Sequence, residues 1–343
     1  MKKVIAVLMS AVMVMMCLAG CKKEENSAPV APEDFRITSY IIADRIQDIK
    51  NLHTEDFDII TDVILIGSVR FDENGAVNDN AEVTKTALDN LRAVIGDRTV
   101  KIYITVLGPS AQTESEDWYE QMDDLASRHT NAFKCEALAS DFARLVNDYG
   151  FDGLFFDYEY PIAKKHWKSF SKFLVELKGE LGEKELGAAL SNWDLNLSKE
   201  AMAAVDRVEM MLYDMYDSEG RHSTYEHSVE LSADFIKHGY DKSTLDFGLP
   251  FYARPTDQDA FWYDYAGYYD KLDADNMAQI PENGKTAYFN TPEIIKKKTA
   301  YALENGFGGV MIWHYNCDLP SSDSHSLLKA IGEAKQEKIQ AKG

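Results

Sequence analysis

The sequence predicts an α/β protein whose folded part, residues 35–343, is a single (β/α)8 TIM barrel. Short and almost continuously apolar runs alternate along the chain with longer stretches of helical periodicity. Parallel strands that are buried on both faces have this apolar character, and eight of them, each followed by a helix, close into a barrel. The length also fits one domain, because barrels of this class commonly reach about 250 residues or more.

Eight runs rich in Val, Ile, Leu, Tyr and Phe are the expected barrel strands. They lie at residues 35–41, 62–69, 99–107, 152–158, 186–192, 207–213, 244–249 and 308–313. Amphipathic stretches are the expected helices, at residues 81–95, 132–148, 164–181, 225–238, 292–305 and 324–338.

Local signals indicate where some helices begin and end. Thr291 is a capping residue that stands directly before Pro292, and proline is well suited to the first position of a helix. Gly150 and Gly306 are expected to end helices before the next strand. The stretch 255–290 is longer than a plain connection and rich in Trp, Tyr and Asp. We therefore expect it to decorate the top of the barrel.

The N-terminal residues predict a lipoprotein: a signal peptide at 1–20, then a lipidated cysteine and flexible tether at 21–34. Lys2 and Lys3 precede an apolar run that is shorter than the roughly 20 residues of a membrane span. Leu-Ala-Gly-Cys at 18–21 resembles a lipobox, which implies cleavage before Cys21 and lipidation of its thiol. An ordinary secretory signal is the alternative. The expected location is the cell envelope, outside the cytoplasm.

Composition narrows the classes of partner. The formal net charge is −21 at pH 7, and such a surface repels nucleic acid and anionic lipid but suits a neutral or cationic polymer. Cys135 and Cys317 could pair outside the cytoplasm, although two cysteines make no disulfide framework. No Cys or His cluster has metal-ligand spacing, so we expect no metal and no other cofactor. His222 and His227 are interpreted as surface residues.

Asp157 and Glu159 are the leading catalytic candidates. They stand two residues apart at the end of the fourth expected strand, so both point to the same face, within roughly 7 Å of each other. Two acids this close cannot both ionise cheaply, so one pKa rises, which is how a general acid at neutral pH is made. An isolated Asp-x-Glu is more often a strand end with two solvated acids.

Active sites of such barrels lie at the carboxyl ends of the strands. Each residue found there could alone be a capping or packing residue, but their convergence on one rim favours a site. The candidates are Tyr40, Gly108, Asp157, Glu159, Asn192, Tyr213, Asp214, Tyr252, Arg254, Trp313 and Asn316.

Four ordered motifs resemble glycoside hydrolase family 18, the chitinase-like group. Residues 152–161, Asp-Gly-Leu-Phe-Phe-Asp-Tyr-Glu-Tyr-Pro, are similar to the family's Asp-Gly-x-Asp-x-Asp-Trp-Glu-Tyr-Pro. Residues 211–214, Met-Leu-Tyr-Asp, resemble its Met-x-Tyr-Asp, and residues 248–254, Gly-Leu-Pro-Phe-Tyr-Ala-Arg, its Gly-x-Pro-x-Tyr-Gly-Arg. Residues 308–313, Gly-Gly-Val-Met-Ile-Trp, resemble its last strand. Residues 35–110 match only loosely.

The resemblance implies a retaining, substrate-assisted mechanism, which is an exception to the usual two-carboxylate scheme. Glu159 would protonate the glycosidic oxygen and later activate water. The nucleophile would be the carbonyl oxygen of the substrate's 2-acetamido group, oriented by Asp157 and hydrogen-bonded by Tyr213. Asp214 would support the acid and the amide, and Trp313 would form an apolar floor. Further substrate-binding candidates are Tyr40, Met211, Asn192, Tyr252 and Arg254.

Two features depart from the family pattern. Phe155 stands where the family has an aspartate that shares a proton with the position of Asp157. We expect this apolar neighbour to raise the pKa of Asp157 and to reduce activity, shift its pH optimum or abolish it. The stretch 255–290 is too short for the module that many processive members insert between strands seven and eight, which implies a shallower cleft and cutting within chains. Aromatics that could stack on sugars, or pack in loops, are Trp118, Trp262 and Tyr263.

The expected function is hydrolysis of β-1,4 bonds next to N-acetylglucosamine, in chitin or chito-oligosaccharides, by a monomeric, lipid-anchored glycosidase. Within the same class, an endo-β-N-acetylglucosaminidase acting on the N-glycan core or on peptidoglycan is the alternative. From another class, Phe155 favours a catalytically impaired glycan-binding lipoprotein. Retention of all four implied catalytic residues favours the enzyme.

Overall fold

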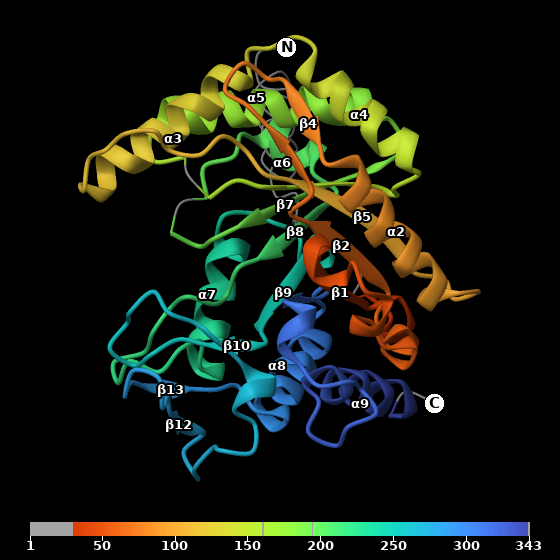
Figure 1. Ribbon diagram of the computed structural model, residues 1–343, viewed down its shortest axis with the longest axis vertical. Helices are drawn as coiled ribbons and strands as arrows, with labels where there is room; N and C mark the ends of the chain where they lie inside the picture. Colours follow the sequence, from red (N-terminus) through yellow and green to blue (C-terminus); the bar gives the residue numbers. More distant parts are fainter. Residues whose placement is uncertain (1–29, 160, 194, 342–343) are drawn as a thin grey trace, which may run out of the picture.

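The computed structural model describes residues 30–341 apart from residues 160 and 194, so the predicted signal peptide and Cys21 lie outside the described residues. Eight parallel strands form a closed barrel with helices around it (Figure 1). This confirms the predicted fold class. In barrel order the strands are β1 (Arg36–Ile42), β14 (Gly309–Trp313), β9 (Leu245–Pro250), β8 (Arg207–Met210), β7 (Glu185–Leu190), β6 (Gly153–Asp157), β5 (Lys101–Val106) and β2 (Asp62–Ile66).

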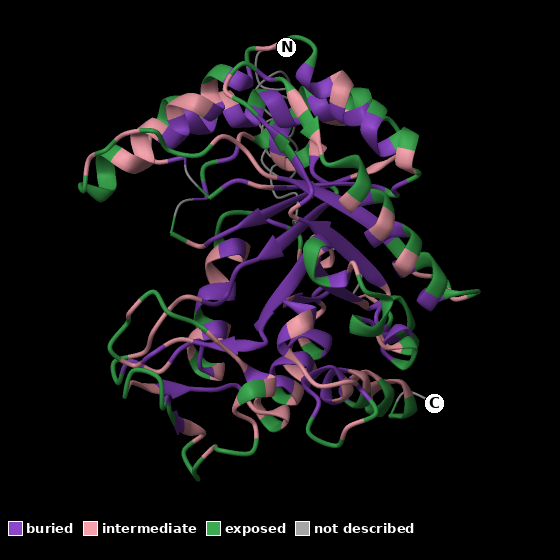
Figure 2. Ribbon diagram, viewed as in Figure 1, coloured by how far each residue is buried: buried purple, intermediate pink, exposed green. Residues whose placement is uncertain are grey.

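The helices pack outside the barrel, and each predicted strand has its counterpart in the structure. Figure 2 shows barrel strands that are buried along most of their length and helices that are buried mainly on the side that faces the barrel. The helices are α2 (Ala81–Ile95), α3 (Trp118–Ala132), α4 (Leu138–Tyr149), α5 (Lys164–Leu181), α6 (Lys199–Ala204), α7 (Tyr225–Lys237), α8 (Pro292–Asn305) and α9 (Leu327–Gln340).

The prediction of one helix over residues 132–148 is wrong at its start, and α3 was missed. The helix α4 begins only at Leu138, and Gly150 ends it in a left-handed conformation as predicted. The helix α3 was missed because it is mostly polar and buries only a few of its side chains. Its one clear signal is Asp117, whose side chain caps the helix by accepting a hydrogen bond from the Glu120 amide at 3.0 Å.

Short elements decorate both ends of the barrel. The hairpin of β3 (Val69–Phe71) and β4 (Val77–Asp79) follows β2, and two more small sheets lie between β9 and α8: β10 (Tyr252–Ala253) with β11 (Tyr263–Asp264), and β12 (Met277–Gln279) with β13 (Thr286–Tyr288). The 3-10 helices are η1 (Pro32–Asp34), η2 (Ala43–Ile46), η3 (Ile49–Asn51), η4 (Thr54–Asp58), η5 (Lys242–Thr244), η6 (Tyr265–Gly267) and η7 (Tyr315–Cys317).

The folded part begins slightly earlier than residue 35. Residues 32–34 form η1, which packs on α9, and Pro32 is buried, so the last residues of the predicted tether belong to the domain. Cys135 and Cys317 are both free thiols, which rules out their pairing in this structure. Within the described part of the chain, no helix is both long and apolar enough to cross a bilayer.

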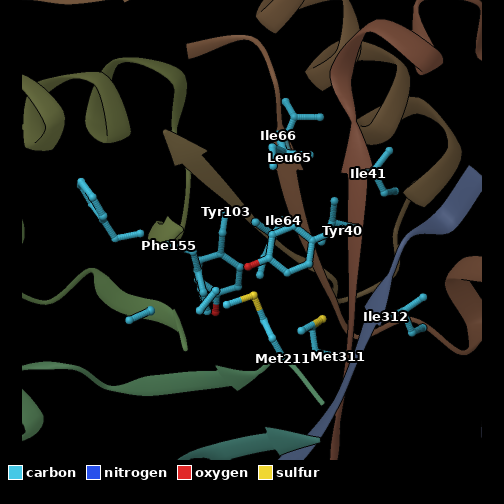
Figure 3. Close-up of a cluster of buried hydrophobic side chains, with 14 of the residues drawn as sticks. Tyr40, Ile41, Ile64, Leu65, Ile66, Tyr103, Phe155, Met211, Met311 and Ile312 are labelled. Atoms are coloured by element: carbon cyan, nitrogen blue, oxygen red, sulfur yellow. The ribbon is translucent and has the colours of Figure 1, made fainter. Parts of the chain in front are cut away.

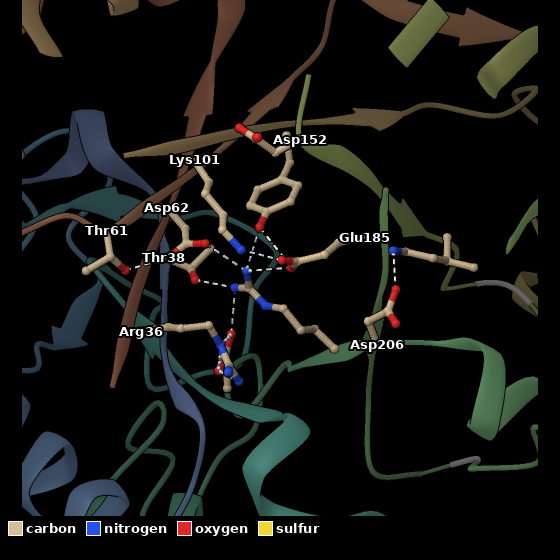
Figure 4. A network of polar contacts seen from close by, with 12 residues as sticks. Arg36, Thr38, Thr61, Asp62, Lys101, Asp152, Glu185 and Asp206 are labelled. Carbon is tan, nitrogen blue, oxygen red and sulfur yellow. Dashed lines mark hydrogen bonds and ion pairs between the residues drawn. The ribbon is translucent and has the colours of Figure 1, made fainter. Parts of the chain in front are cut away.

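Inward-facing side chains fill the barrel in layers. Because alternate residues of a strand face the interior, residues two apart on one strand belong to successive layers. The lower layer surrounds the Arg207 guanidinium, which makes polar contacts with side chains from β1, β2, β5 and β9 (Figure 4). The guanidinium also lies over the Phe155 ring of β6. The members of this layer are Thr38, Asp62, Tyr103, Phe155, Arg207 and Asp246. Two residues further along the same strands, the upper layer contains Tyr40, Ile64, Thr105, Asp157, Glu209 and Gly248.

Gly187 on β7 makes room for Phe155 in the lower layer. The Phe155 ring packs against Tyr103, with ring centroids 5.0 Å apart (Figure 3). A Cβ atom at residue 187 would lie 2.1 Å from a Phe155 ring carbon, closer than any real contact. The absence of a side chain at residue 187 therefore allows an aromatic ring at residue 155.

Replacement of this glycine should destabilise the barrel. We expect Gly187→Ala to lower the free energy of unfolding by roughly 1–3 kcal/mol, because the new methyl group overpacks the interior. Urea denaturation monitored by circular dichroism measures the change. The matched control is Gly179→Ala in α5, where a Cβ meets nothing within 4 Å and alanine should be neutral or stabilising. Equal midpoints for the two variants would contradict the packing argument.

Candidate active site

The predicted rim residues come together at the carboxyl ends of the barrel strands. Asp157 is the last residue of β6 and is half-buried, while Glu159 follows two residues later with its side chain exposed at the mouth. Oδ1 of Asp157 has no hydrogen-bond partner among the described residues. The two acids thus differ in access: Asp157 faces the interior, and Glu159 is open to an incoming ligand.

Both acids have raised pKa values. Burial raises the pKa of Asp157 above its ordinary range. Glu159 is accessible at the mouth but enclosed by protein on its other sides, and this desolvation, followed by the charges of Asp157 and Asp214, raises its pKa to about 8. The direction agrees with the sequence-based expectation. At neutral pH a group of this kind can donate a proton and take it back.

Asp214 is the ionised acid of the site. Burial alone would raise its pKa, but contacts with His222, Arg254 and Tyr252 hold it well below its ordinary range. Arg254 binds both carboxylate oxygens, with Nη2 2.7 Å from Oδ2, and the Tyr252 hydroxyl donates to Oδ1. Asp214 adopts a left-handed conformation with φ of 60°, a region that aspartate tolerates better than most residues. Its charge is therefore fixed in place next to Glu159.

The prediction that His222 is a surface residue is wrong. The side chain is fully buried, and its Nε2 accepts a hydrogen bond from the Asp214 amide at 2.9 Å. Burial lowers the pKa of His222, so the ring is uncharged at neutral pH and Nε2 is free to accept this hydrogen bond. The adjacent Ser223 is held by the buried Lys298, whose Nζ donates to the Ser223 carbonyl oxygen at 2.6 Å. Sequence reasoning missed this support because His222 lies in a segment without a strand signal and Lys298 is far from Asp214 in the chain.

Aromatic residues line the mouth on the β1 and β14 side. Trp313 ends β14 and is half-buried, and its ring meets Tyr40 edge-on at 5.3 Å. Tyr213 is buried, with its hydroxyl 3.8 Å from the sulfur of Met311. Met211 is also buried, and Figure 3 shows it next to Met311. Together they leave a mostly apolar surface facing the acids.

A hollow of about 310 Å³ opens beside the two acids. Its wall is formed by the segment after β5, and Asp157 and Glu159 lie at its edge. Gly108 permits this wall to lie close to α3, because a Cβ at residue 108 would fall 1.9 Å from Nε2 of His129. The hollow is large enough for a small polar group such as part of a sugar ring.

The remaining candidates lie around the rim. Asn192 follows β7, and its Nδ2 donates to Asp234 at 3.2 Å. Trp118 is 66% exposed, whereas Trp262 is 37% exposed and packs edge-on against Tyr252. Tyr263 is half-buried in β11. Three exposed aromatics at the same end of the barrel were not singled out from the sequence: Tyr119, Trp193 and Phe261.

The guanidinium of Arg254 should control the charge of Asp214. We expect Arg254→Met to raise the pKa of Asp214 toward its ordinary range, because burial then acts with less compensation. Carboxyl-carbon NMR titration of labelled protein measures this pKa. Arg254→Lys keeps the charge without the two-pronged contact and should raise the pKa less. An unchanged titration in Arg254→Met would show that Tyr252 and His222 suffice.

The family assignment follows from comparison with known proteins. The model of the family "Glycosyl hydrolases family 18" matches residues 36–318, which include nearly the whole barrel. The chain belongs to glycoside hydrolase family 18. Its barrel and its strand-end motifs are therefore those of a glycosidase-like protein.

Individual relatives are distant. Endochitinase 1 of Metarhizium anisopliae is 24% identical over 55% of this chain, and the match spans 58% of that protein. A family 18 chitinase of Flavobacterium johnsoniae has a TM-score of 0.67 and 25% identity, over 88% of this chain and 94% of that one. A mutant plant class V chitinase of Cycas revoluta, solved in complex with (GlcNAc)3, has a TM-score of 0.63 and 18% identity, over 87% and 98% of the chains.

Proposed function

We propose that the protein is a retaining glycosidase that cleaves β-1,4 bonds next to N-acetylglucosamine in chitin or chito-oligosaccharides. The proposal depends on one observation: Glu159 stands at the mouth of the barrel with a raised pKa, two residues from the half-buried Asp157 and next to the ionised Asp214. This arrangement provides a proton donor at neutral pH together with fixed negative charge where positive charge develops.

The proposed reaction uses the substrate's own amide. Glu159 gives its proton to the glycosidic oxygen while the acetamido carbonyl oxygen attacks the anomeric carbon and the bond to the leaving sugar breaks. Asp157 holds the amide N–H, and the Tyr213 hydroxyl donates to the carbonyl oxygen. Glu159 then takes a proton from water, which opens the cyclic intermediate with overall retention. Trp313 offers an apolar face beneath the sugar.

A substrate panel tests this proposal. Chito-oligosaccharides, a high-mannose glycopeptide and peptidoglycan are incubated with the protein, and products are identified by mass spectrometry and by NMR of the newly formed anomer. Release of β-anomers from chito-oligosaccharides supports the proposal. Cleavage of only the glycopeptide or only peptidoglycan would contradict the chito-oligosaccharide substrate and would favour an endo-β-N-acetylglucosaminidase instead.

The pKa of Glu159 predicts the alkaline limit of activity. The first step needs the protonated acid, so kcat/KM should stay high through neutral pH and fall about tenfold per pH unit above a pH of about 8. Initial rates on a chito-oligosaccharide across the pH range measure the limit. A limit near pH 4, the ordinary range of glutamate, would contradict the raised pKa.

A glycan-binding protein without catalysis is the second candidate, and Phe155 is the observation that favours it. Its ring fills the barrel directly below Asp157, where the family has a carboxyl group. For this candidate, isothermal titration calorimetry would show binding of chito-oligosaccharides while no product appears at any pH.

The location at the cell envelope is part of the proposal. The lipobox-like segment ending at Cys21 supports it. Metabolic labelling with a fatty-acid analogue should mark the wild-type protein but leave Cys21→Ser unlabelled. On membrane fractionation, the wild type should remain with the membranes and the variant should appear in the soluble fraction. Labelling of Cys21→Ser would contradict lipidation at this residue.

A further inference from the structure

The upper interior layer of the barrel contains a second buried carboxyl group, that of Glu209. The side chain is fully buried, and Oε1 accepts a hydrogen bond from Nη2 of Arg207 at 3.2 Å, while Oε2 has no hydrogen-bond partner among the described residues. A buried carboxyl oxygen without a partner is costly, so its presence calls for a functional explanation.

Strand register puts Glu209 near Asp157. Asp157 pairs with Ala189 on β7, and Ala189 pairs with Glu209 on β8, so the three residues form one row across neighbouring strands. Strands lie about 4.8 Å apart, which separates the outer two Cα atoms by roughly 10 Å. Both side chains point into a closed barrel and converge toward its axis, so the carboxyl groups lie closer together than the Cα atoms.

Polar atoms without partners gather in this same layer. Besides Oε2 of Glu209 they are the Tyr40 hydroxyl, Oγ1 of Thr105 and Oδ1 of Asp157, from four different strands. Burial raises the pKa of Tyr40, and the ionised forms of Glu209 and Asp157 would raise it further, in agreement with the shared layer. The layer is thus a polar pocket around Asp157, directly above the charged lower layer.

Charge balance indicates that Glu209 carries a proton. The network below it contains two guanidinium groups, of Arg36 and Arg207, against the buried carboxyl groups of Asp62, Asp246 and Glu209. At its edge Glu185 also contacts Arg207, but its charge is balanced by Lys101. Two positive charges neutralise two carboxylates, and a third buried charge would be unpaired. Burial, and then the charge of Asp246, raise the pKa of Glu209, in agreement with this count.

We propose that Glu209 is a positioning residue that shares its proton with Asp157 and so replaces, from β8, the carboxyl group missing at residue 155. Oε2 of Glu209, Oδ1 of Asp157 and the Tyr40 hydroxyl have no hydrogen-bond partner among the described residues, so the proposed bond from protonated Glu209 to Asp157 forms when one of these side chains rotates toward the other. Glu209 makes no bond to substrate. The charged groups that face Glu209 from below are those of Arg207, Asp246, Asp62 and Arg36. Asp157 and Tyr40 lie beside it in the upper layer, and Tyr213 lies nearer the mouth. This inference depends on the proposed function only for its kinetic readout.

The test compares wild type with Glu209→Gln, Phe155→Asp, the double variant and a control. The amide introduced by Glu209→Gln keeps the shape of the side chain but cannot share the proton. We expect kcat on a chito-oligosaccharide at neutral pH to fall about tenfold, as for loss of one charge-assisted hydrogen bond, with KM little changed and the pH profile shifted. Adding Phe155→Asp should recover most of this loss of kcat.

The control is Glu185→Gln. It removes another carboxyl group that contacts Arg207, at 3.6 Å, but Glu185 lies below the upper layer, so this variant should keep the wild-type pH profile.

An unchanged pH profile in Glu209→Gln would overturn the proposal, as would a folded double variant no more active than Glu209→Gln. If the double variant fails to fold, the profile of Glu209→Gln decides. If the wild type cleaves no substrate, the proposed function fails, and carboxyl-carbon NMR then decides this inference separately. The titration of Asp157 should shift in Glu209→Gln and stay in place in Glu185→Gln, and an unshifted titration would reject the role of Glu209.

Discussion

Replacement of Glu159 by glutamine should abolish hydrolysis while the protein still binds its substrate. The amide has the size of the carboxyl group but cannot donate a proton to the glycosidic oxygen. General acid–base catalysis typically contributes about 10²–10⁴ in rate, so we expect kcat to fall by that factor. Because Glu159 stands at the mouth and the fold does not depend on it, the stability and the dissociation constant for chito-oligosaccharide should change little.

The comparison needs a variant with the same chemical change elsewhere. Glu183→Gln is the control, because residue 183 is exposed between α5 and β7, at the opposite end of the barrel. Its kcat should equal that of wild type. Equal and negligible turnover by wild type and Glu159→Gln, with oligosaccharide binding retained in both, would favour the binding protein over the enzyme.

The sequence predicts the barrel well because its strands carry a strong local signal. All eight strands were located from apolar runs, and α2 and α5 have the predicted bounds, since their buried faces recur with helical period. The acids at residues 157 and 159 were found because they stand at the end of a clearly predicted strand. Active sites of such barrels lie at the carboxyl ends of the strands, so this place in the sequence predicts a place on the rim.

What the sequence could not show depends on contacts between distant strands. His222 lies in a loop, and nothing around it reveals that its ring supports Asp214. Arg207 and Glu209 stand in an expected strand, where charged residues suggest a face open to solvent, yet both are buried inside the barrel. Their partners come from strands scattered along the chain, so only closure of the barrel brings the charges together.

Replacement of Arg207 by methionine should have the largest effect on stability. Arg207 is 3% exposed, and its guanidinium binds Asp62 at 2.9 Å and Asp246 at 2.8 Å. Methionine fills similar space but leaves the buried carboxylate of Asp62 without a neutralising charge and that of Asp246 with Arg36 alone. Removal of one partner from a buried ion pair typically costs about 3–5 kcal/mol, and we expect the free energy of unfolding to fall by this amount.

A surface arginine provides the matched control. The Arg144 side chain in α4 is 67% exposed and pairs with Asp141, and loss of such a pair costs about 0–1 kcal/mol, so Arg144→Met should unfold close to wild type. Chemical denaturation measures both variants. If Arg207→Met does not fold, we combine it with Asp62→Asn. This second change removes the unpaired buried charge of residue 62 and should recover soluble protein. An Arg207→Met variant as stable as Arg144→Met would mean that the acids of the lower layer are already neutral, and the charge count that assigns the proton to Glu209 would then be wrong.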